Sequence, residues 1–311
     1  MDDLAIIGGG PAGVAAGIYA ARKKMQTTLI TDTFGGQSLV SDNVENWIGE
    51  VRISGFDLAK KMEDHLRAQA SVTVKDGERV VRIERSEGGF TLTTDKGSSI
   101  QARTVLVASG SFRKRLDVPG EREREGKGVF FCSICDAPLM GGKRVVVVGG
   151  GNAGLEAVID LLPYAEKVYL LHRRDTLKGD AVTAERIKKE AKVEIVYNAE
   201  TREIGGGGDA VEFLKYRDVK SGEEKQLQVN GIFVAVGALP SSELVKDLVF
   251  RNERGEVVVD SKTQKTSCEG VWAAGDVTDV LYKQNNISAG DAVKAVLNIY
   301  EYLQKLSKNG K

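Results

Sequence analysis

The 311-residue chain contains little of what metal centres and disulfide scaffolds are built from, with only 2 histidines and 3 cysteines. Two histidines argue against a histidine-rich metal site, so no metal is expected, and three cysteines are too few for a secreted disulfide scaffold. The chain also has no net charge, because 44 basic residues balance 44 acidic ones. This balance argues against a nucleic-acid-binding protein that relies on overall basicity.

Long uncharged stretches are scarce as well, and the clearest of them, residues 4–21, is interpreted as something other than a membrane span. Asp2 and Asp3 precede it, whereas a secretion signal begins with positive charge. The run Gly-Gly-Gly-Pro at 8–11 interrupts any continuous helix, and much of the rest is weakly apolar Ala and Gly. We therefore expect no membrane association and a cytoplasmic protein.

Glycine, in contrast, is abundant, with 36 glycines against 5 prolines. Two groups of these glycines lie in segments that repeat the order strand, glycine turn, helix, strand. The first copy occupies residues 4–7, 8–13, 13–23 and 27–30, and the second occupies residues 144–148, 149–151, 152–162 and 168–171. Two such βαβ beginnings predict an α/β protein with two Rossmann-like, doubly wound nucleotide-binding domains, which agrees with about 150 residues per domain.

Both glycine turns carry the spacing G-x-G-x-x-G between a predicted strand and a predicted helix. The first glycine permits the tight turn, the second lets a pyrophosphate approach the backbone, and the third lets the helix pack closely on the strand. The helix N-terminus then offers free N–H groups to the phosphates. One such motif is a weak signal, but two in the right context indicate two dinucleotide sites. The six glycines are Gly8, Gly10, Gly13, Gly149, Gly151 and Gly154.

The residues at the ends of the following strands differ between the two sites. Asp32 follows the first fingerprint at the spacing at which Arg173 follows the second. An acid there accepts hydrogen bonds from ribose hydroxyls, whereas arginine suits a 2′-phosphate, so we expect FAD, or alternatively NAD, in the first site and NADPH in the second. Arg174 and Lys178 would add positive charge to the second site. Thr31 competes with Asp32 for the ribose, and the two arginines alternatively form a solvated surface pair.

The third feature is the pair Cys132 and Cys135, separated by Ser-Ile and followed by Asp136. Cysteines at this spacing close a redox-active disulfide in which one thiol is the nucleophile of exchange. A zinc site would need two more ligands that Cys268 and the histidines do not supply, and a purely structural disulfide is the other alternative. Asp136 is a candidate acid/base for the thiols, or else a helix cap or surface charge. Cys268 stands alone and is interpreted as structural.

Several further motifs occur in a fixed order: Gly-Gly-Gln at 35–37, Glu-Asn-Trp at 45–47, His-Arg-Arg-Asp at 172–175 and Ala-Gly-Asp at 274–276. Together with the fingerprints and the cysteine pair, they make the chain resemble the low-molecular-weight thioredoxin reductases of bacteria and archaea over essentially its whole length. The resemblance implies a discontinuous FAD-binding domain at 1–115 and 242–311, with an inserted NADPH-binding domain at 116–241. Further cofactor-binding residues implied by it are Pro11, Ala12, Gly35, Gly36, Gln37, Asn46, Gly110, Asn152, Ala153, His172, Gly237, Gly275, Asp276 and Gln284.

The resemblance also implies the reaction. NADPH would reduce the flavin, and the flavin would reduce the Cys132–Cys135 disulfide, with Cys135 facing the flavin and Asp136 supplying protons. Cys132 would then attack the disulfide of a thioredoxin- or glutaredoxin-like partner. Members of this family form homodimers, so a homodimer is expected here.

The sequence departs from that family in places. Ala-Pro-Leu at 137–139, Phe-Gly-Gly-Gln at 34–37 and Tyr-Lys-Gln at 282–284 are closer to the C-terminal region of the alkyl hydroperoxide reductase flavoprotein subunit, which generally prefers NADH. Lys178 stands where arginine is common. The alternative function is therefore an NADH-dependent reductase of a small redox carrier that feeds a peroxidase system. A ferredoxin–NADP reductase-like diaphorase lacks the cysteine pair, and a redox sensor without turnover is not excluded by fold alone.

Overall fold

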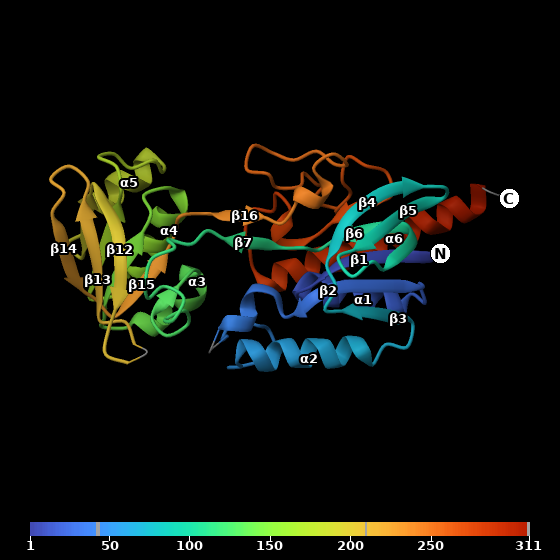
Figure 1. Cartoon of the computed structure of the whole chain (residues 1–311), viewed down its shortest axis with the longest axis horizontal. Helices are drawn as coiled ribbons and strands as arrows, with labels where there is room; N and C mark the ends of the chain where they lie inside the picture. Colours follow the sequence, from blue (N-terminus) through green and yellow to red (C-terminus); the bar gives the residue numbers. More distant parts are fainter. Residues whose placement is uncertain (42–43, 209, 310–311) are drawn as a thin grey trace. The chain divides into compact units, whose positions relative to one another are not determined.

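A computed structural model describes residues 1–41, 44–208 and 210–309 of the chain. The chain divides into two compact units. The first unit consists of Met1–Leu39, Asn43–Phe112 and Leu239–Lys311, and the second unit consists of Val40–Asp42 and Arg113–Ala238. The first unit is thus discontinuous in sequence and the second is inserted into it (Figure 1). None of the helices among the described residues is both long enough and apolar enough to cross a membrane.

The first unit is built on a mixed sheet with the strand order β3-β2-β1-β6-β5-β4, in which β17 also pairs with β6. Strand β1 pairs in parallel on both sides, with Ile6 opposite Leu29 of β2 and Leu106 of β6. The elements are β1 (Asp2–Gly9), α1 (Pro11–Arg22), β2 (Thr27–Phe34), η1 (Gly36–Val40), α2 (Gly55–Arg67), β3 (Val72–Asp76), β4 (Val80–Ser86), β5 (Gly89–Thr94), β6 (Ser99–Val107), η3 (Glu243–Val245), β17 (Val271–Ala273), η4 (Gly275–Val277) and α6 (Asn285–Asn309).

Both faces of this sheet are buried, because successive side chains of a strand point to opposite faces. Leu4 and Ile6 of β1 pack in one cluster with residues of α1, α2 and α6. Ala5 and Ile7 belong to a second cluster on the other face, together with residues of β5 and β17. Cys268 is part of that second cluster and only 7% exposed, which agrees with a structural role.

The second unit contains a fully parallel sheet with the order β11-β10-β9-β15-β8 and a separate antiparallel sheet β12-β13-β14. Figure 1 shows the three antiparallel strands side by side in yellow and orange. The elements are β8 (Val129–Phe130), α3 (Ser133–Asp136), η2 (Ala137–Met140), β9 (Arg144–Val148), α4 (Asn152–Leu161), β10 (Lys167–His172), α5 (Ala181–Lys188), β11 (Val193–Tyr197), β12 (Ala199–Gly205), β13 (Phe213–Asp218), β14 (Glu224–Gln228) and β15 (Gly231–Val234).

The side chains of strand β9 show that the parallel sheet of this unit is covered on both faces. Its valines alternate, so that Val145 and Val147 pack with residues of α4 and α5, while Val146 and Val148 pack with residues of β12 and β13. A continuous β-branched run is typical of a parallel strand that is buried on both faces. The α/β fold predicted from the two fingerprints, with two Rossmann-like units, is confirmed.

The chain passes between the units through two short strands that pair with each other, β7 (Ser111–Arg113) and β16 (Ala238–Pro240). Two of the predicted glycines flank these strands. In the first unit the carbonyl of Gly110 accepts a hydrogen bond from the Ser241 N–H, and in the second unit the carbonyl of Gly237 accepts one from the Lys114 N–H. These two glycines therefore lie beside the two segments through which the chain passes from one unit to the other.

Candidate active site

The first glycine turn joins β1 to α1 and shows what each glycine does. A Cβ atom at Gly13 would lie 1.8 Å from the carbonyl oxygen of Gly8, so any side chain there would separate the helix from the strand. At Gly10 the nearest protein atom to a Cβ would be the Gly36 Cα at 3.8 Å. Packing therefore requires Gly13 but not Gly10, where a Cβ would make only an ordinary van der Waals contact and the glycine leaves the backbone bare. This is what a ligand that approaches the backbone closely needs.

The second turn, between β9 and α4, repeats this pattern. A Cβ at Gly154 would lie 1.7 Å from the Gly149 carbonyl oxygen, and a Cβ at Gly151 would meet no heavy atom of the described residues within 4 Å. The next predicted residue, Asn152, accepts a hydrogen bond at Oδ1 from the Asp180 N–H at 2.7 Å. Asn152 thus connects the start of α4 to the start of α5.

The N-termini of α1 and α4 differ from those of α2 and α5. Gly10 and Gly151 are the N-cap residues of α1 and α4, and no side chain in the described part of the chain caps either helix. By contrast, Ser54 caps α2 and Asp180 caps α5 through side-chain oxygens that accept backbone N–H bonds. Uncapped N–H groups at a helix start favour an anion. The two fingerprints therefore fit the diphosphates of two dinucleotide cofactors, with Pro11 and Ala12 in the first turn of α1 and Ala153 in that of α4.

Residues predicted for the FAD site converge within the first unit. Gln37 donates from Nε2 to Ser111 Oγ at 3.0 Å and to Asp276 Oδ2 at 3.2 Å. Gly275 has a left-handed backbone, and a Cβ there would lie 3.3 Å from the Ala12 Cβ. Residues from both ends of the chain are thus brought to the start of α1. Gly35 and Gly36, with φ of +93° and +60°, form the turn between β2 and η1.

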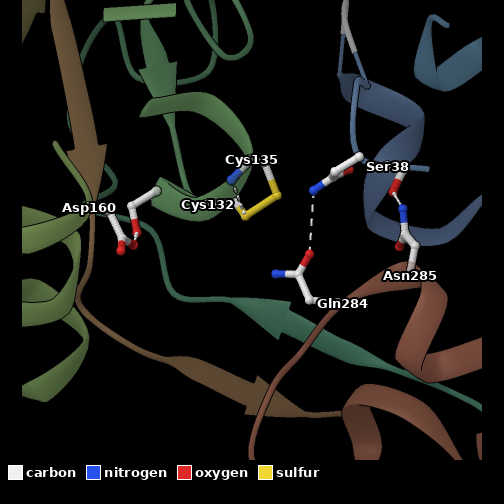
Figure 2. Close-up of a disulfide and its surroundings, with 8 residues drawn as sticks. Ser38, Cys132, Cys135, Asp160, Gln284 and Asn285 are labelled. Atoms are coloured by element: carbon white, nitrogen blue, oxygen red, sulfur yellow. Dashed lines mark hydrogen bonds between the residues drawn. A yellow bond between two sulfur atoms is a disulfide. The ribbon is translucent and has the colours of Figure 1, made fainter. Parts of the chain in front are cut away.

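A second group of polar contacts connects the start of α6 to η1 and to the segment that follows it. Asn46 donates to Gln284 Oε1 at 3.4 Å, and Asn285 donates to Ser38 Oγ at 2.7 Å (Figure 2). Asn286 donates to the Asn46 carbonyl oxygen at 2.7 Å. Sequence reasoning predicted Asn46 and Gln284 but not the two asparagines after Gln284. Their polarity beside Gln284, a predicted cofactor-binding residue, was the signal available for them.

Asp32 lies at the end of β2, half-exposed, and accepts a hydrogen bond at Oδ2 from Arg79 Nη2 at 2.6 Å. Its competitor, Thr31, is only 4% exposed, and its hydroxyl donates to the Thr33 carbonyl oxygen at 2.6 Å. Asp32 is therefore the side chain accessible to a ribose. Sequence reasoning missed Arg79, which no local pattern connects to Asp32.

His172 is a buried residue that packs against the second glycine turn. It is 8% exposed, and Nδ1 accepts a hydrogen bond from the Gly150 N–H at 3.2 Å. A Cβ at Gly150 would lie 2.6 Å from the His172 Cγ, so the ring occupies that space. Burial lowers the pKa of His172 below its ordinary value of 6.5, and the positive charges of Arg174 and Arg173 act in the same direction. His172 is thus a neutral imidazole that acts on this site through Gly150.

This arrangement predicts an acid-sensitive turn. The unfolded chain binds a proton at His172 more readily than the folded chain does, so the free energy of unfolding falls as pH drops below about 6.5. His172→Ala should lower it by about 1–3 kcal/mol at pH 8, because the buried Gly150 N–H loses its acceptor. His172→Asn keeps an acceptor near Nδ1, so it should lose less and flatten the acid dependence. Chemical denaturation at pH 8 and pH 5.5 measures this, and equal acid dependence in all three proteins contradicts it.

Three cations surround this turn. Arg173, Arg174 and Lys178 are all exposed, and within the described part of the chain none of them forms a salt bridge. The Lys178 N–H donates to the Gly150 carbonyl oxygen at 2.7 Å, which folds the loop back onto the fingerprint. Unpaired positive charge beside a diphosphate site fits an additional phosphate group.

The predicted cysteine pair forms a disulfide in the second unit (Figure 2). Cys132 is the N-cap of α3, and its Sγ accepts a hydrogen bond from the Cys135 N–H at 3.2 Å. A donor aimed at one sulfur stabilises negative charge on that sulfur, which favours Cys132 as the nucleophile after reduction. Ile134, between the cysteines, is 58% exposed.

Asp136 follows Cys135 directly and is the last residue of α3. Burial raises the pKa of its carboxyl to about 6, against the opposing effect of the positive charge on Arg113. A carboxyl with this pKa exchanges a proton near neutral pH, as acid/base chemistry beside a disulfide requires. Arg113, in the same unit, was not predicted, because nothing in the local sequence connects it to Asp136.

Comparison with known proteins agrees with these features. A family model described as pyridine nucleotide-disulphide oxidoreductase matches residues 2–295. An alkyl hydroperoxide reductase subunit of Pseudomonas putida is 41% identical over 307 residues, which cover 98% of this chain and 59% of that protein. A protein named NADH dehydrogenase from Bacillus subtilis is 39% identical over 301 residues, 97% of this chain and 58% of that protein. The chain thus spans about three fifths of the length of these curated relatives.

A solved structure gives the same result for the fold. The crystal structure of thioredoxin reductase from Streptococcus pyogenes is similar with a TM-score of 0.93 at 33% sequence identity. The match covers 98% of this chain and 99% of that one.

Proposed function

This chain belongs to the pyridine nucleotide-disulphide oxidoreductase family, and from that premise we propose that it is a flavin-dependent reductase of a protein disulfide, specifically an NADPH-dependent thioredoxin-disulfide reductase. The observation that supports this most directly is a combination of features within the second unit. The unit contains the Cys132–Cys135 disulfide, the Asp136 carboxyl with its pKa of about 6, and the uncapped glycine turn at the start of α4 beside unpaired cations. FAD would be held by the first unit and NADPH by the second.

When bound, the flavin and the nicotinamide supply hydride transfer and deliver two electrons to the disulfide. The residues of this chain then carry the electrons to the partner. The Cys132 thiolate attacks one sulfur of the partner's disulfide and forms a mixed disulfide, and the other partner sulfur leaves as a thiolate. Cys135 next loses its proton and attacks the Cys132 sulfur, which restores the disulfide. With that proton and the one from Asp136, the partner leaves as a dithiol. Asp136 donates a proton to a leaving thiolate and regains one in the following cycle.

Recognition of the 2′-phosphate is assigned to the exposed cations. Arg173→Ala should lower kcat/KM for NADPH by about 10–100-fold, since one charged hydrogen-bonding group is worth about 1.5–3 kcal/mol. The kcat/KM for NADH should change by less than about 3-fold, because NADH carries no such phosphate. Arg186→Ala, an exposed arginine on α5, is the matched control. Equal loss with both nucleotides would remove Arg173 from this role.

The alternative is an NADH-dependent reductase of a small redox carrier that feeds a peroxidase system. It is favoured by the similarity to the alkyl hydroperoxide reductase of Pseudomonas putida and to the protein named NADH dehydrogenase. The ratio of kcat/KM values for the two nucleotides separates the two proposals. In both cases the partner is a thioredoxin- or glutaredoxin-like protein. A homodimer and a cytoplasmic location remain predictions from the sequence.

An anaerobic titration tests the proposed function. The protein reconstituted with FAD is titrated first with NADPH and, in a second sample, with NADH, while the flavin absorbance is recorded. Wild type should take up twice as many electrons as the flavin alone accepts, because the disulfide is reduced as well. A protein that binds no flavin, or that takes up only the flavin's electrons, would overturn the proposal.

A further inference from the structure

Ser133, the residue after Cys132, makes a contact to which neither the family resemblance nor the proposed reaction assigns a role. Ser133 donates from Oγ to Asp160 Oδ2 at 2.6 Å in a partly buried position. Figure 2 shows Asp160 reaching from its helix toward the disulfide turn. This length is typical of a hydroxyl bonded to an ionised carboxylate, which is among the stronger hydrogen bonds in proteins.

The position of Asp160 is unfavourable for its own helix. It is the last but one residue of α4, where the negative end of the helix dipole repels an acidic side chain. No basic residue in the last turn of α4 compensates within the described residues. The hydrogen bond with Ser133 offsets this unfavourable interaction.

The contact continues an apolar interface between the same segments. Ala137 and Met140, just after the disulfide turn, are buried in one cluster with Leu155, Val158 and Leu161 of α4. Helix α3 has only 4 residues, too few to be stable by itself. The apolar contacts with α4 belong to η2, and none of the four residues of α3 is buried, so the Ser133–Asp160 hydrogen bond holds α3 itself on α4.

We propose that Asp160 is a positioning residue of the redox centre, which holds the Cys132–Cys135 turn in its disulfide-bonded form through Ser133. This rests on the proposed function and adds to it a residue outside the CxxC motif. Reduction breaks the S–S bond and adds two electrons and two protons, so the two sulfurs separate. A contact that holds the turn closed therefore favours the oxidised form. Helix α4 thereby connects a dinucleotide turn at its first residue to the redox turn near its last.

The test is the equilibrium between disulfide and dithiol in the full chain without flavin or nicotinamide. Purified protein is equilibrated in mixtures of reduced and oxidised dithiothreitol, and free thiols are counted by maleimide labelling and mass. Ser133→Ala and Asp160→Ala should each shift the equilibrium toward the dithiol by about tenfold, equivalent to about 30 mV. The double variant should shift no further than either single variant, because both remove the same bond.

Two variants control this measurement. Ser133→Thr keeps the hydroxyl, and Glu156→Gln removes an exposed carboxylate one turn earlier on the same helix. Both should remain within about twofold of wild type. Unchanged equilibria in the two single variants would overturn the proposal, as would additive shifts in the double variant or an equal shift in Glu156→Gln. Because no cofactor is present, this result is independent of whether the anaerobic titration supports the proposed function.

Discussion

Replacement of Cys132 by serine is expected to reduce protein-disulfide reduction by at least ~10³-fold, because the nucleophile of the exchange step is lost. Cys135 is the other thiol of this turn, but its own N–H donates to the Cys132 sulfur, so the stabilised thiolate is that of Cys132. Reduction of the bound flavin by the nicotinamide should continue at its normal rate, because it precedes the disulfide. Stopped-flow absorbance measures that step, and turnover with thioredoxin measures the whole reaction.

The matched variant is Cys135→Ser. It also abolishes turnover, but it keeps the Cys132 thiol, so a mixed disulfide with the partner should accumulate and appear as a covalent band under non-reducing conditions. Cys132→Ser should give no such band. A Cys132→Ser protein that reduced thioredoxin at the wild-type rate, or a band formed by that variant instead, would show that the roles of the two cysteines are wrongly assigned.

Sequence reasoning was most successful where backbone sterics leave no choice. Any side chain at Gly13 or Gly154 would clash with the backbone of the first glycine of the same turn, so only glycine allows the helix to pack there. The fingerprint spacing therefore predicts the strand, the turn and the helix directly. The strand predicted at 144–148 and the helix predicted from 152 coincide with β9 and the start of α4. The CxxC disulfide was predictable for a similar reason, because three residues of separation bring the two sulfurs together.

Contacts between distant residues were not predictable in this way. Gln37 and Asp276 meet across 239 residues, and Ser133 meets Asp160 across 27, and each contact depends on how helices pack on the sheet rather than on local sequence. Helix α2 was missed even though Ser54 and Asp57 form a capping pattern at its start. The antiparallel sheet β12-β13-β14 was also not predicted as a layer, because short alternating runs do not specify the face that they cover.

We expect Asp136→Asn to raise the stability of the protein and to lower its activity. The pKa of the folded carboxyl is about 6, above its ordinary value of 3.8. The folded protein therefore favours the protonated carboxyl, and this contribution to stability is complete below about pH 3.8 and is lost as pH rises through about 6. Above pH 6 the wild type holds a half-buried carboxylate, and the neutral amide should raise the free energy of unfolding by about 1–3 kcal/mol.

The same substitution should lower disulfide-reductase turnover by about 10²-fold, because the amide exchanges no proton with the leaving thiolate. The wild-type pH profile should contain a limb with an apparent pKa near 6, and this limb should be absent from the variant. Denaturation curves at pH 5 and pH 8, measured beside turnover at both values, test the two effects together. The gain in stability should be larger at pH 8, where the loss in turnover persists. A variant that is less stable at pH 8 than at pH 5 relative to wild type would contradict the raised pKa, and unchanged turnover would remove Asp136 from the proton transfer.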